Sequence, residues 1–296
     1  MRAPGWRLIR LASAVSATGL AAASCGTGSP AASTKATATT AATAHAAQVR
    51  WMIASGALRL LSAPARQVIE SNPLNLVVYQ PTQTPAAMAA VPVAAFRSFA
   101  ALSAAISAGT LSTGFKYVLL DLESWQFTPR NEQADPARYY VEAAQLLRQH
   151  GLRLIAAPGT NVFSNSASLQ GRNYQRMLAS GIFQAVAPYA AIFSIQSQSL
   201  EFEPSTFTSY VSQAASALRS ANPAITVFAG ISTNPPAGTA TASQLADVMK
   251  SVSSEVNGFW LNVPKPGPSC PNCKPLNVAA ANGLLERPVI SPLGGP

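Results

Sequence analysis

Residues 116–125, KYVLLDLESW, have the pattern of a buried strand that ends in polar side chains. Side chains alternate between the two faces of a β-strand. One face is wholly apolar, as expected against a covering helix, and consists of Val118, Leu120 and Leu122. The opposite face becomes acidic only at its carboxyl end, with Asp121 and Glu123. The carboxyl ends of parallel strands are where α/β folds build their sites, so this stretch predicts both a fold and the place of a site.

Strand-like and helix-like runs alternate along the chain on both sides of this stretch. The expected strands are 49–54, 75–80, 116–125, 152–157, 191–198, 225–232 and 256–263. The expected helices are 59–71, 93–108, 136–150, 173–187, 205–220, 241–254 and 277–285. Strands separated by helices of this length imply βα units and a parallel sheet.

About seven such units predict an α/β fold of the (β/α)8 TIM-like barrel type. The eighth unit is not obvious: it is incomplete or irregular, or residues 288–291 supply its strand. A doubly wound open sheet is the alternative. No Gly-rich phosphate loop follows any expected strand, which argues against a nucleotide-binding sheet, and no cofactor is expected.

The first 24 residues have the pattern of a bacterial secretion signal. Arginines precede an apolar run, 11–23, that is too short to span a bilayer. The segment 22–25, AASC, is similar to a lipobox, which predicts lipidation of Cys25 and a lipoprotein anchored on the outside of the cell membrane. The alternative is a soluble secreted protein that is cleaved nearby.

The chain after the signal divides into a spacer and one folded domain. Residues 25–48 are an Ala/Thr/Ser run without apolar periodicity and are expected to be disordered. Residues 49–296 are expected to form a single barrel domain and a monomer. Its membrane contact would be made through the N-terminal lipid alone.

The charge of the chain argues against nucleic-acid binding. Removal of the signal arginines lowers Lys plus Arg from 20 to 17 and the net charge from +9 to +6. The basic residues are scattered, without runs or interleaved aromatics, so a nucleic-acid partner is not expected. Weak attraction to anionic polymers of the cell surface is consistent with this charge.

The remaining cysteines, Cys270 and Cys273, form the motif CPNC. In an exported chain such a pair predicts a local disulfide. Prolines crowd the motif on both sides, whereas a redox CxxC belongs at a helix N-terminus after a strand. A zinc site would need about two more ligands, and no metal is expected.

Polar side chains also stand near the carboxyl ends of other expected strands. They are Asn161 after the PGT turn, Gln196 and Gln198 on one strand face, and Trp260 and Asn262 on another. In a barrel these faces converge on one mouth. An inward polar set is either a satisfied network or a ligand site. Two carboxylates on one strand face repel each other and resist burial, which favours a site for Asp121 and Glu123.

The residue types that are missing narrow the chemistry. The two histidines are His45 in the spacer and His150 at a helix end, which excludes a Ser-His-Asp, Cys-His or histidine-ligated metal site. Carboxylates, amides and aromatic rings remain. This combination suits a sugar: acids for proton transfer, amides for hydroxyls, and Trp125 or Trp260 against the pyranose face.

A strand that ends in Asp-x-Glu resembles the signature strand of family 18 chitinase-like glycoside hydrolases, DxxDxDxE. There the Glu is the acid, and the preceding Asp assists the N-acetyl group of the substrate. Asp121 and Glu123 match the last two acids, whereas Lys116 and Leu119 stand at the two earlier Asp positions. A late-strand Trp such as Trp260 is also similar to that family, although its middle-strand Tyr/Asp pair is absent. The wider block DLESWQFTP…EQADPARYY resembles secreted actinobacterial barrel proteins.

The resemblance implies a glycoside hydrolase that acts on an extracellular polysaccharide. Glu123 would be the general acid, with a pKa raised by Asp121, and Asp121 would stabilise the developing positive charge. Glu201 or Glu203 is the nearest further carboxylate if one is needed. The alternatives are a non-catalytic barrel that binds a glycan or a partner, and an envelope lipoprotein whose mouth is plugged by side chains.

Overall fold

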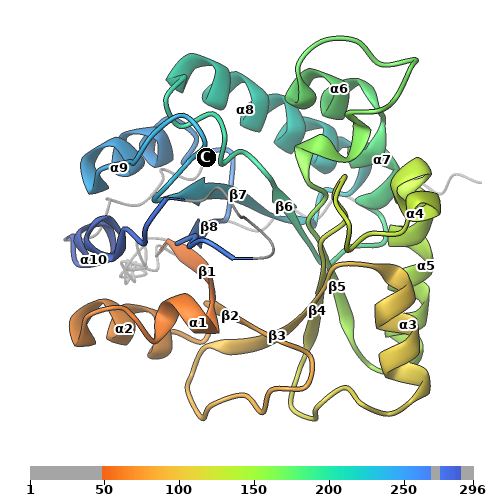
Figure 1. The fold of residues 1–296 in the computed structure, drawn as a ribbon, viewed down its shortest axis with the longest axis horizontal. Coiled ribbons are helices and arrows are strands. Elements are labelled where there is room, and N and C mark those ends of the chain that lie inside the picture. Colours follow the sequence, from red (N-terminus) through yellow and green to blue (C-terminus); the bar gives the residue numbers. More distant parts are fainter. Residues whose placement is uncertain (1–48, 268–273, 288–296) are drawn as a thin grey trace, which may run out of the picture. The chain divides into compact units, whose positions relative to one another are not determined.

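The computed structural model describes residues 49–267 and 274–287. Within them, eight parallel strands close into a barrel in chain order, and the last strand completes the ring by pairing with the first (Figure 1). The strands are β1 (Arg50–Ala54), β2 (Leu76–Tyr79), β3 (Val91–Phe96), β4 (Tyr117–Leu120), β5 (Arg153–Ala156), β6 (Ile192–Ile195), β7 (Thr226–Ser232) and β8 (Gly258–Asn262). The (β/α)8 prediction is confirmed, and the open-sheet alternative is wrong.

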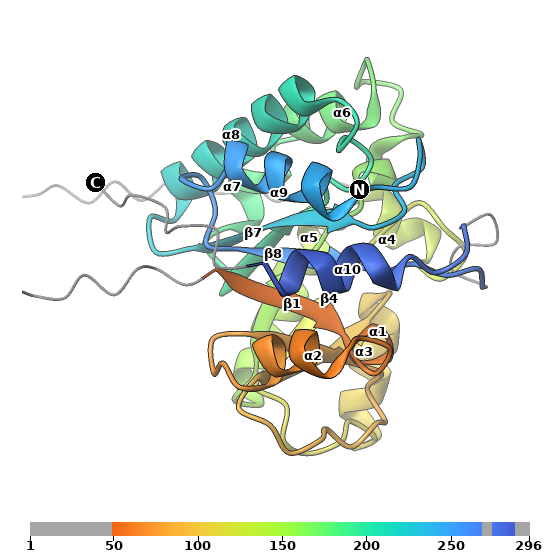
Figure 2. The same ribbon diagram turned by 90° about the vertical axis from the view of Figure 1, so that its left-hand side faces the viewer.

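Helices cover the outside of these strands, and the side view shows them on both sides of the barrel (Figure 2). They are α1 (Ser55–Leu58), α2 (Ala63–Glu70), α3 (Phe99–Ser107), α4 (Arg130–Ala134), α5 (Pro136–Gln149), η1 (Thr160–Phe163), α6 (Asn173–Ala179), α7 (Ile182–Val186), α8 (Pro204–Ala221), α9 (Ala242–Ser251) and α10 (Val278–Leu285). None of these described helices combines the length and apolar character that a membrane crossing requires.

The strand that the sequence analysis did not find is β3, and it lies where a helix was expected. The predicted helix 93–108 divides into β3 and α3, and Ser98 caps α3 by accepting a hydrogen bond from the Ala101 N–H at 3.1 Å. The segment is rich in alanine, which favours a helix, but β2 and β4 pair with it from both sides. No helix separates β2 from β3, so the irregular unit is the second one, and the prediction of an irregular eighth unit is wrong.

Several sequence predictions fall outside the described residues. These are the signal 1–24 with Cys25, the spacer 25–48 and the Cys270–Cys273 pair. They stay predictions. Residues 288–291 also lie outside the described residues, but they do not close the barrel, because β8 pairs with β1.

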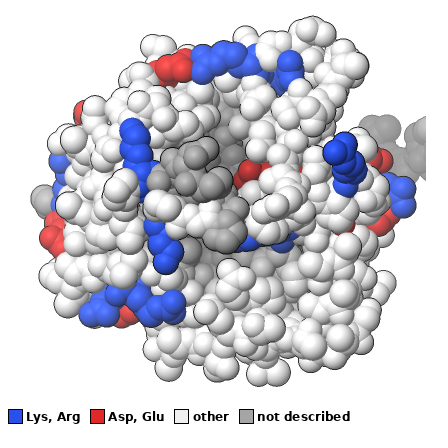
Figure 3. All heavy atoms as spheres, viewed as in Figure 1, with Lys and Arg blue, Asp and Glu red and all other residues white. Residues whose placement is uncertain are grey.

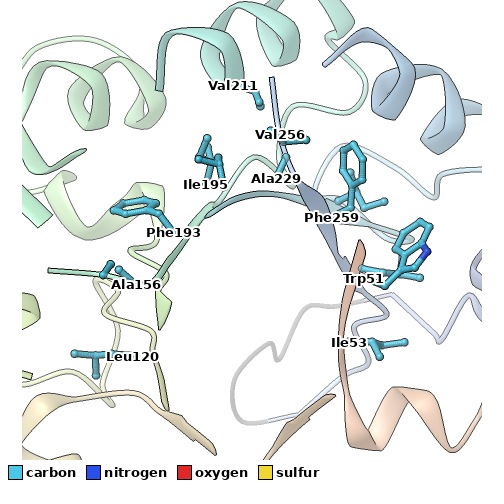
Figure 4. Packing of buried hydrophobic residues seen from close by; sticks show 14 of the residues in the cluster. Trp51, Ile53, Leu120, Ala156, Phe193, Ile195, Val211, Ala229, Val256 and Phe259 are labelled. Atoms are coloured by element: carbon cyan, nitrogen blue, oxygen red, sulfur yellow. The ribbon is translucent and has the colours of Figure 1, made fainter. Parts of the chain in front are cut away.

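The strands separate two layers of apolar side chains. Figure 4 shows Ile53, Leu120, Phe193 and Phe259 on the outer side of the strands, where they belong to the core under the helices. A smaller cluster fills the barrel interior and consists of Met52, Leu76, Val78, Val93, Leu119, Ile155, Ala157, Ile192, Phe228 and Trp260. Leu119 faces inward and Leu120 outward, as strand alternation predicts. Asp121 therefore continues the inward row, one layer above Leu119.

Candidate active site at the carboxyl end of the barrel

The backbone at the end of β4 is held from both sides. The Asp121 N–H donates to the Phe96 carbonyl at 2.9 Å and extends the pairing with β3. The hydroxyl of Tyr140, a fully buried residue of α5, donates to the Leu120 carbonyl and accepts from the Leu122 N–H, both at 3.2 Å. These bonds satisfy backbone groups next to Asp121 and fix where its side chain leaves the chain.

A single hydroxyl then organises the loop after β4. Thr128 is buried, and its oxygen accepts hydrogen bonds from the Glu123 N–H at 3.2 Å and from the Trp125 indole N–H at 2.7 Å. The same hydroxyl donates to the Arg97 carbonyl at 2.7 Å. Thr128 thus ties Glu123, Trp125 and the end of β3 to one point.

The carboxylate of Glu123 is positioned by the loop after β5. The Asn161 amide donates to Glu123 Oε2 at 3.1 Å, and its oxygen accepts from the Ser124 N–H at 3.1 Å. A Cβ added at Gly159 would lie 2.4 Å from Cγ and 2.8 Å from Cδ of Glu123. Gly159 therefore leaves the space that the Glu123 side chain occupies.

The predicted site residues surround one cavity of about 640 Å³ at this end of the barrel. Those that line it are Asp121, Glu123, Trp125, Gln196, Gln198, Trp260 and Asn262. Asn161 lies behind them and reaches the site through Glu123. Among the described residues, the side chains around the mouth leave this cavity open rather than filling it. Figure 3 shows acidic atoms near the centre of the face, and further acidic side chains, like the Lys and Arg side chains, spread toward its rim.

Three of the lining residues carry a buried polar atom without a partner. Among the described residues, Asp121 Oδ1, Trp260 Nε1 and Asn262 Nδ2 have no hydrogen-bond partner. Buried polar groups are normally paired, since an unpaired one costs about 1–3 kcal/mol. These atoms are donors and an acceptor that a ligand in the cavity could satisfy.

Gln196 and Gln198 lie side by side on the wall formed by β6 and its extension. The amide of Gln198 donates to Gln196 Oε1. A Cβ at Gly230 of β7 would lie 2.4 Å from Cδ of Gln198, so this glycine makes room for the amide. The pair is partly a network and partly cavity lining, which combines the two interpretations left open by the sequence.

Burial raises the pKa of both acids. For Asp121 the pKa is raised well above its usual value, first by burial and then by the charge of Glu123, while Arg97 opposes the shift. The pKa of Glu123 is raised by burial, against the Asn161 hydrogen bond and Arg97. Burial is the largest cause of the raised pKa for both acids, and the charge of Glu123 adds to the shift at Asp121. The expectation that Asp121 raises the pKa of Glu123 stays a prediction.

Arg97 is a cavity residue that the sequence analysis missed. It follows β3, and its guanidinium carbon lies 5.3 Å from the centroid of the Trp125 ring and 4.6 Å from that of Phe127. It forms no ion pair within 4.0 Å with a described residue. Arg97 lies on the same strand face as Val93 and Ala95, so recognising 91–96 as a strand would have placed it at the mouth.

The further carboxylates considered from the sequence do not line this cavity. Glu203 lies on the surface and forms a bidentate pair with Arg172, at 2.6 Å for each bond. Glu201 is buried and accepts from the Ser232 N–H at 2.7 Å. Among the described residues, no group of three or more His, Cys, Asp or Glu side chains could hold a metal ion.

No family model and no curated protein matches the sequence. Among solved structures, a chitinase from Chromobacterium violaceum ATCC 12472 is 13% identical, with a TM-score of 0.46 over 81% of this chain and 99% of the other. A Schiff-base-forming fructose-1,6-bisphosphate aldolase is 12% identical, with a TM-score of 0.46 over 81% of this chain and 94% of the other. The spore cortex-lytic enzyme SleL of Bacillus megaterium QM B1551 is 9% identical, with a TM-score of 0.42 over 74% of this chain and 71% of the other. With identities and TM-scores this low, these likenesses carry no weight for function.

Proposed function

We propose that the chain is a glycoside hydrolase-like protein of the cell exterior that acts on a polysaccharide through Asp121 and Glu123. The observation that carries the proposal is the placement of both acids, with raised pKa values, in a cavity lined by amides and indoles. The export signal expected at residues 1–24 is consistent with a substrate outside the cell.

The acids can supply the proton that glycoside cleavage needs. Because burial raises the pKa of Asp121 and of Glu123, the pair keeps a proton at pH values where free carboxyls have lost theirs. Glu123 stands nearer the mouth and would donate a proton to the glycosidic oxygen. Asp121, once ionised, would stabilise the positive charge that develops on the sugar ring.

The lining residues would bind the sugar. The unpartnered Trp260 Nε1 and Asn262 Nδ2 are donors for hydroxyl oxygens, and Gln196 and Gln198 offer further amide groups. The indole N–H of Trp125 is already bonded to Thr128, so this ring offers its apolar surface rather than its polar edge.

A glycan-binding barrel without turnover is the second candidate, and one observation favours it. Leu119 fills the place of an acid in the chitinase-like signature and is buried among the apolar interior side chains. No further acid therefore lies directly beneath Asp121 on β4, whose inward face carries Tyr117 and Leu119. Binding would use the same lining residues without the proton transfer.

Substitution of the acids separates the two functions. On a panel of β-linked polymers, Glu123→Gln is expected to lower hydrolysis by about 10²–10⁴-fold while leaving binding and the unfolding transition in place. Glu142→Gln, which removes a partly exposed acid paired with Arg138, is the control and should keep full activity. Full activity of Glu123→Gln would refute the enzyme proposal, and binding without turnover in the unmodified protein would favour the second candidate.

A further inference from the structure

The guanidinium of Arg97 is held by aromatic rings rather than by hydrogen bonds. Its central carbon lies near the rings of Trp125 and Phe127, which pack edge to face at 5.3 Å. The loop hydroxyl of Thr128 fixes the Arg97 backbone and the Trp125 indole together. None of the guanidinium N–H groups forms a hydrogen bond or ion pair with another described residue. The guanidinium is therefore held near these two rings, and its N–H donors have no partner among the described residues.

Unused in-plane donors of this kind suit a planar anion. The guanidinium presents a fork of N–H groups that matches a carboxylate with two parallel hydrogen bonds. Arg97 also lowers the pKa of Asp121 and Glu123, so it is close enough to act on both acids electrostatically. An anion bound by Arg97 would lie in the same cavity as the proposed reaction.

The cavity adjoins a further hollow across Trp125, and a second hollow continues from that one. One of about 410 Å³ is lined by Trp125 together with Arg130, Gln133 and Asn165. A second, of about 550 Å³, shares those last three residues and extends to the segment after η1. Successive hollows that share walls can accommodate several sugar units of one chain, rather than a single small molecule.

Apart from Asp121 and Glu123, the charged residues that line these hollows are positive. Arg130 is the charged residue that lines the two outer hollows, and Arg97 is the cation of the inner cavity. No acid besides Asp121 and Glu123 is among the described residues that line the three. An anionic polymer would meet cations on both sides of Trp125 and no opposing charge beyond the reacting pair.

We propose that the ligand is a polysaccharide with carboxylate-bearing sugars, and that Arg97 binds the carboxylate of a sugar inside the cavity while Arg130 faces a later unit of the chain. This inference rests on the proposed function, which it narrows to uronate-type glycans. Arg97 is a specificity residue in this scheme: it binds the substituent and takes no part in bond cleavage.

Matched glycans provide the test. Oligosaccharides of polygalacturonate, alginate and hyaluronan, each beside its carboxyl-reduced counterpart, are titrated calorimetrically into the folded chain carrying Glu123→Gln to prevent turnover. We expect at least one acidic form to bind more than about 10-fold tighter than its reduced form, since hydrogen bonds to a charged group are stronger than those between neutral groups. Adding Arg97→Gln should remove this preference, and Arg97→Lys should keep only part of it.

A second arginine supplies the control. Arg153 also stacks on an aromatic ring, that of Tyr117 at 5.4 Å, but lies at the start of β5, at the opposite end of the barrel. Arg153→Gln should leave the acid-to-reduced binding ratio unchanged. If Arg97 merely adjusts the two acids, Arg97→Gln will shift the pH profile of cleavage and leave that ratio intact, which overturns the inference.

The failure of this inference can be told from failure of the proposed function. Equal binding or cleavage of acidic and reduced glycans, with activity lost in Glu123→Gln, overturns the carboxylate preference and keeps the hydrolase. Binding and cleavage of no glycan, acidic or neutral, overturns both.

Discussion

At the amino end of the barrel, Asn75 is fully buried just before β2 and uses its whole side chain. Its oxygen accepts from the Trp51 N–H at 2.8 Å, and its amide donates to the Val68 and Ile69 carbonyls at 3.1 and 3.2 Å. At the carboxyl end, Asn262 closes β8, and its amide nitrogen is buried without a partner among the described residues. Asn75 is therefore fully paired, whereas the Asn262 amide nitrogen is not.

Two buried acids at the carboxyl end also differ in how completely they are paired. Glu132 is 1% exposed, and its two oxygens accept from the Phe99 and Ala100 N–H groups at 2.6 and 2.9 Å, at the start of α3. Asp121, by comparison, keeps one buried oxygen unpaired. Paired polar groups stabilise the fold, whereas unpaired groups around a cavity are held ready for a ligand at a cost in stability. Substitutions of fully paired residues and of unpaired cavity residues should therefore affect different properties, stability for the first and ligand binding for the second.

The largest effect on the mouth should come from Gly159→Ala. The new methyl would overlap the Glu123 side chain, and displacing the carboxyl by about 1 Å can lower the rate about 100-fold. Gly56→Ala is the matched control, because its Cβ would meet no atom within 4 Å. The rate of polymer cleavage measures activity, and urea unfolding measures stability. Unchanged activity in Gly159→Ala would mean that the position of Glu123 is irrelevant to function.

At the amino end, Asn75→Ala should lower the free energy of unfolding by about 2–3 kcal/mol and leave ligand affinity unchanged, since it removes three buried hydrogen bonds. Asn262→Ala is its counterpart at the mouth. It should weaken binding and change stability by less than about 1 kcal/mol, because no protein bond is lost. Urea unfolding and calorimetry on both variants test the comparison. A stability loss of equal size in both would remove the distinction between the ends.

Part of this contrast could be predicted from the sequence. The inward position of Asp121 and Glu123 follows from local alternation along β4, which needs no knowledge of neighbouring strands. The convergence of Gln196, Trp260 and Asn262 follows once the strands are arranged as a barrel. These residues therefore meet in one cavity because side chains alternate along each strand and because the strands form a barrel.

The features of the fold and the site that the sequence did not predict depend on contacts between distant segments. The alanine-rich β3 is a strand because β2 and β4 pair with it, and Arg97 was missed with it. Thr128 is a single hydroxyl whose partners lie on Glu123, Trp125 and Arg97, and no sequence pattern indicates such a meeting point. The unpaired atoms at the mouth likewise become visible in three dimensions alone.

A buried acid outside the cavity gives a pH-dependent test. Burial raises the pKa of Glu201 from 4.5 to about 8, so the folded state holds the proton more tightly than the unfolded state. The contribution of Glu201 is therefore fully favourable below pH 4.5 and is lost as the pH rises to about 8. In that window the free energy of unfolding should fall by about 1.4 kcal/mol per pH unit. Glu201→Gln keeps the acceptor for Ser232 and should make the curve measured by urea unfolding less steep, with Asp121 and Glu123 responsible for part of the slope that remains. A wild-type slope that persists in the variant would assign the pH dependence to other groups.

The smallest expected effects are those of replacing the two tryptophans at the mouth, Trp260 and Trp125, by phenylalanine. Trp260→Phe removes a buried N–H that has no partner among the described residues, so stability should change by less than about 1 kcal/mol while glycan binding weakens. Trp125→Phe removes an N–H bonded to Thr128 at 2.7 Å and should lower the free energy of unfolding by about 0.5–1.5 kcal/mol. Calorimetric binding and urea unfolding of both variants measure the difference. If Trp260→Phe destabilises as much as Trp125→Phe and binds as well as the parent, the Trp260 N–H is not a ligand donor, and the carboxyl end is held together in the same way as the amino end.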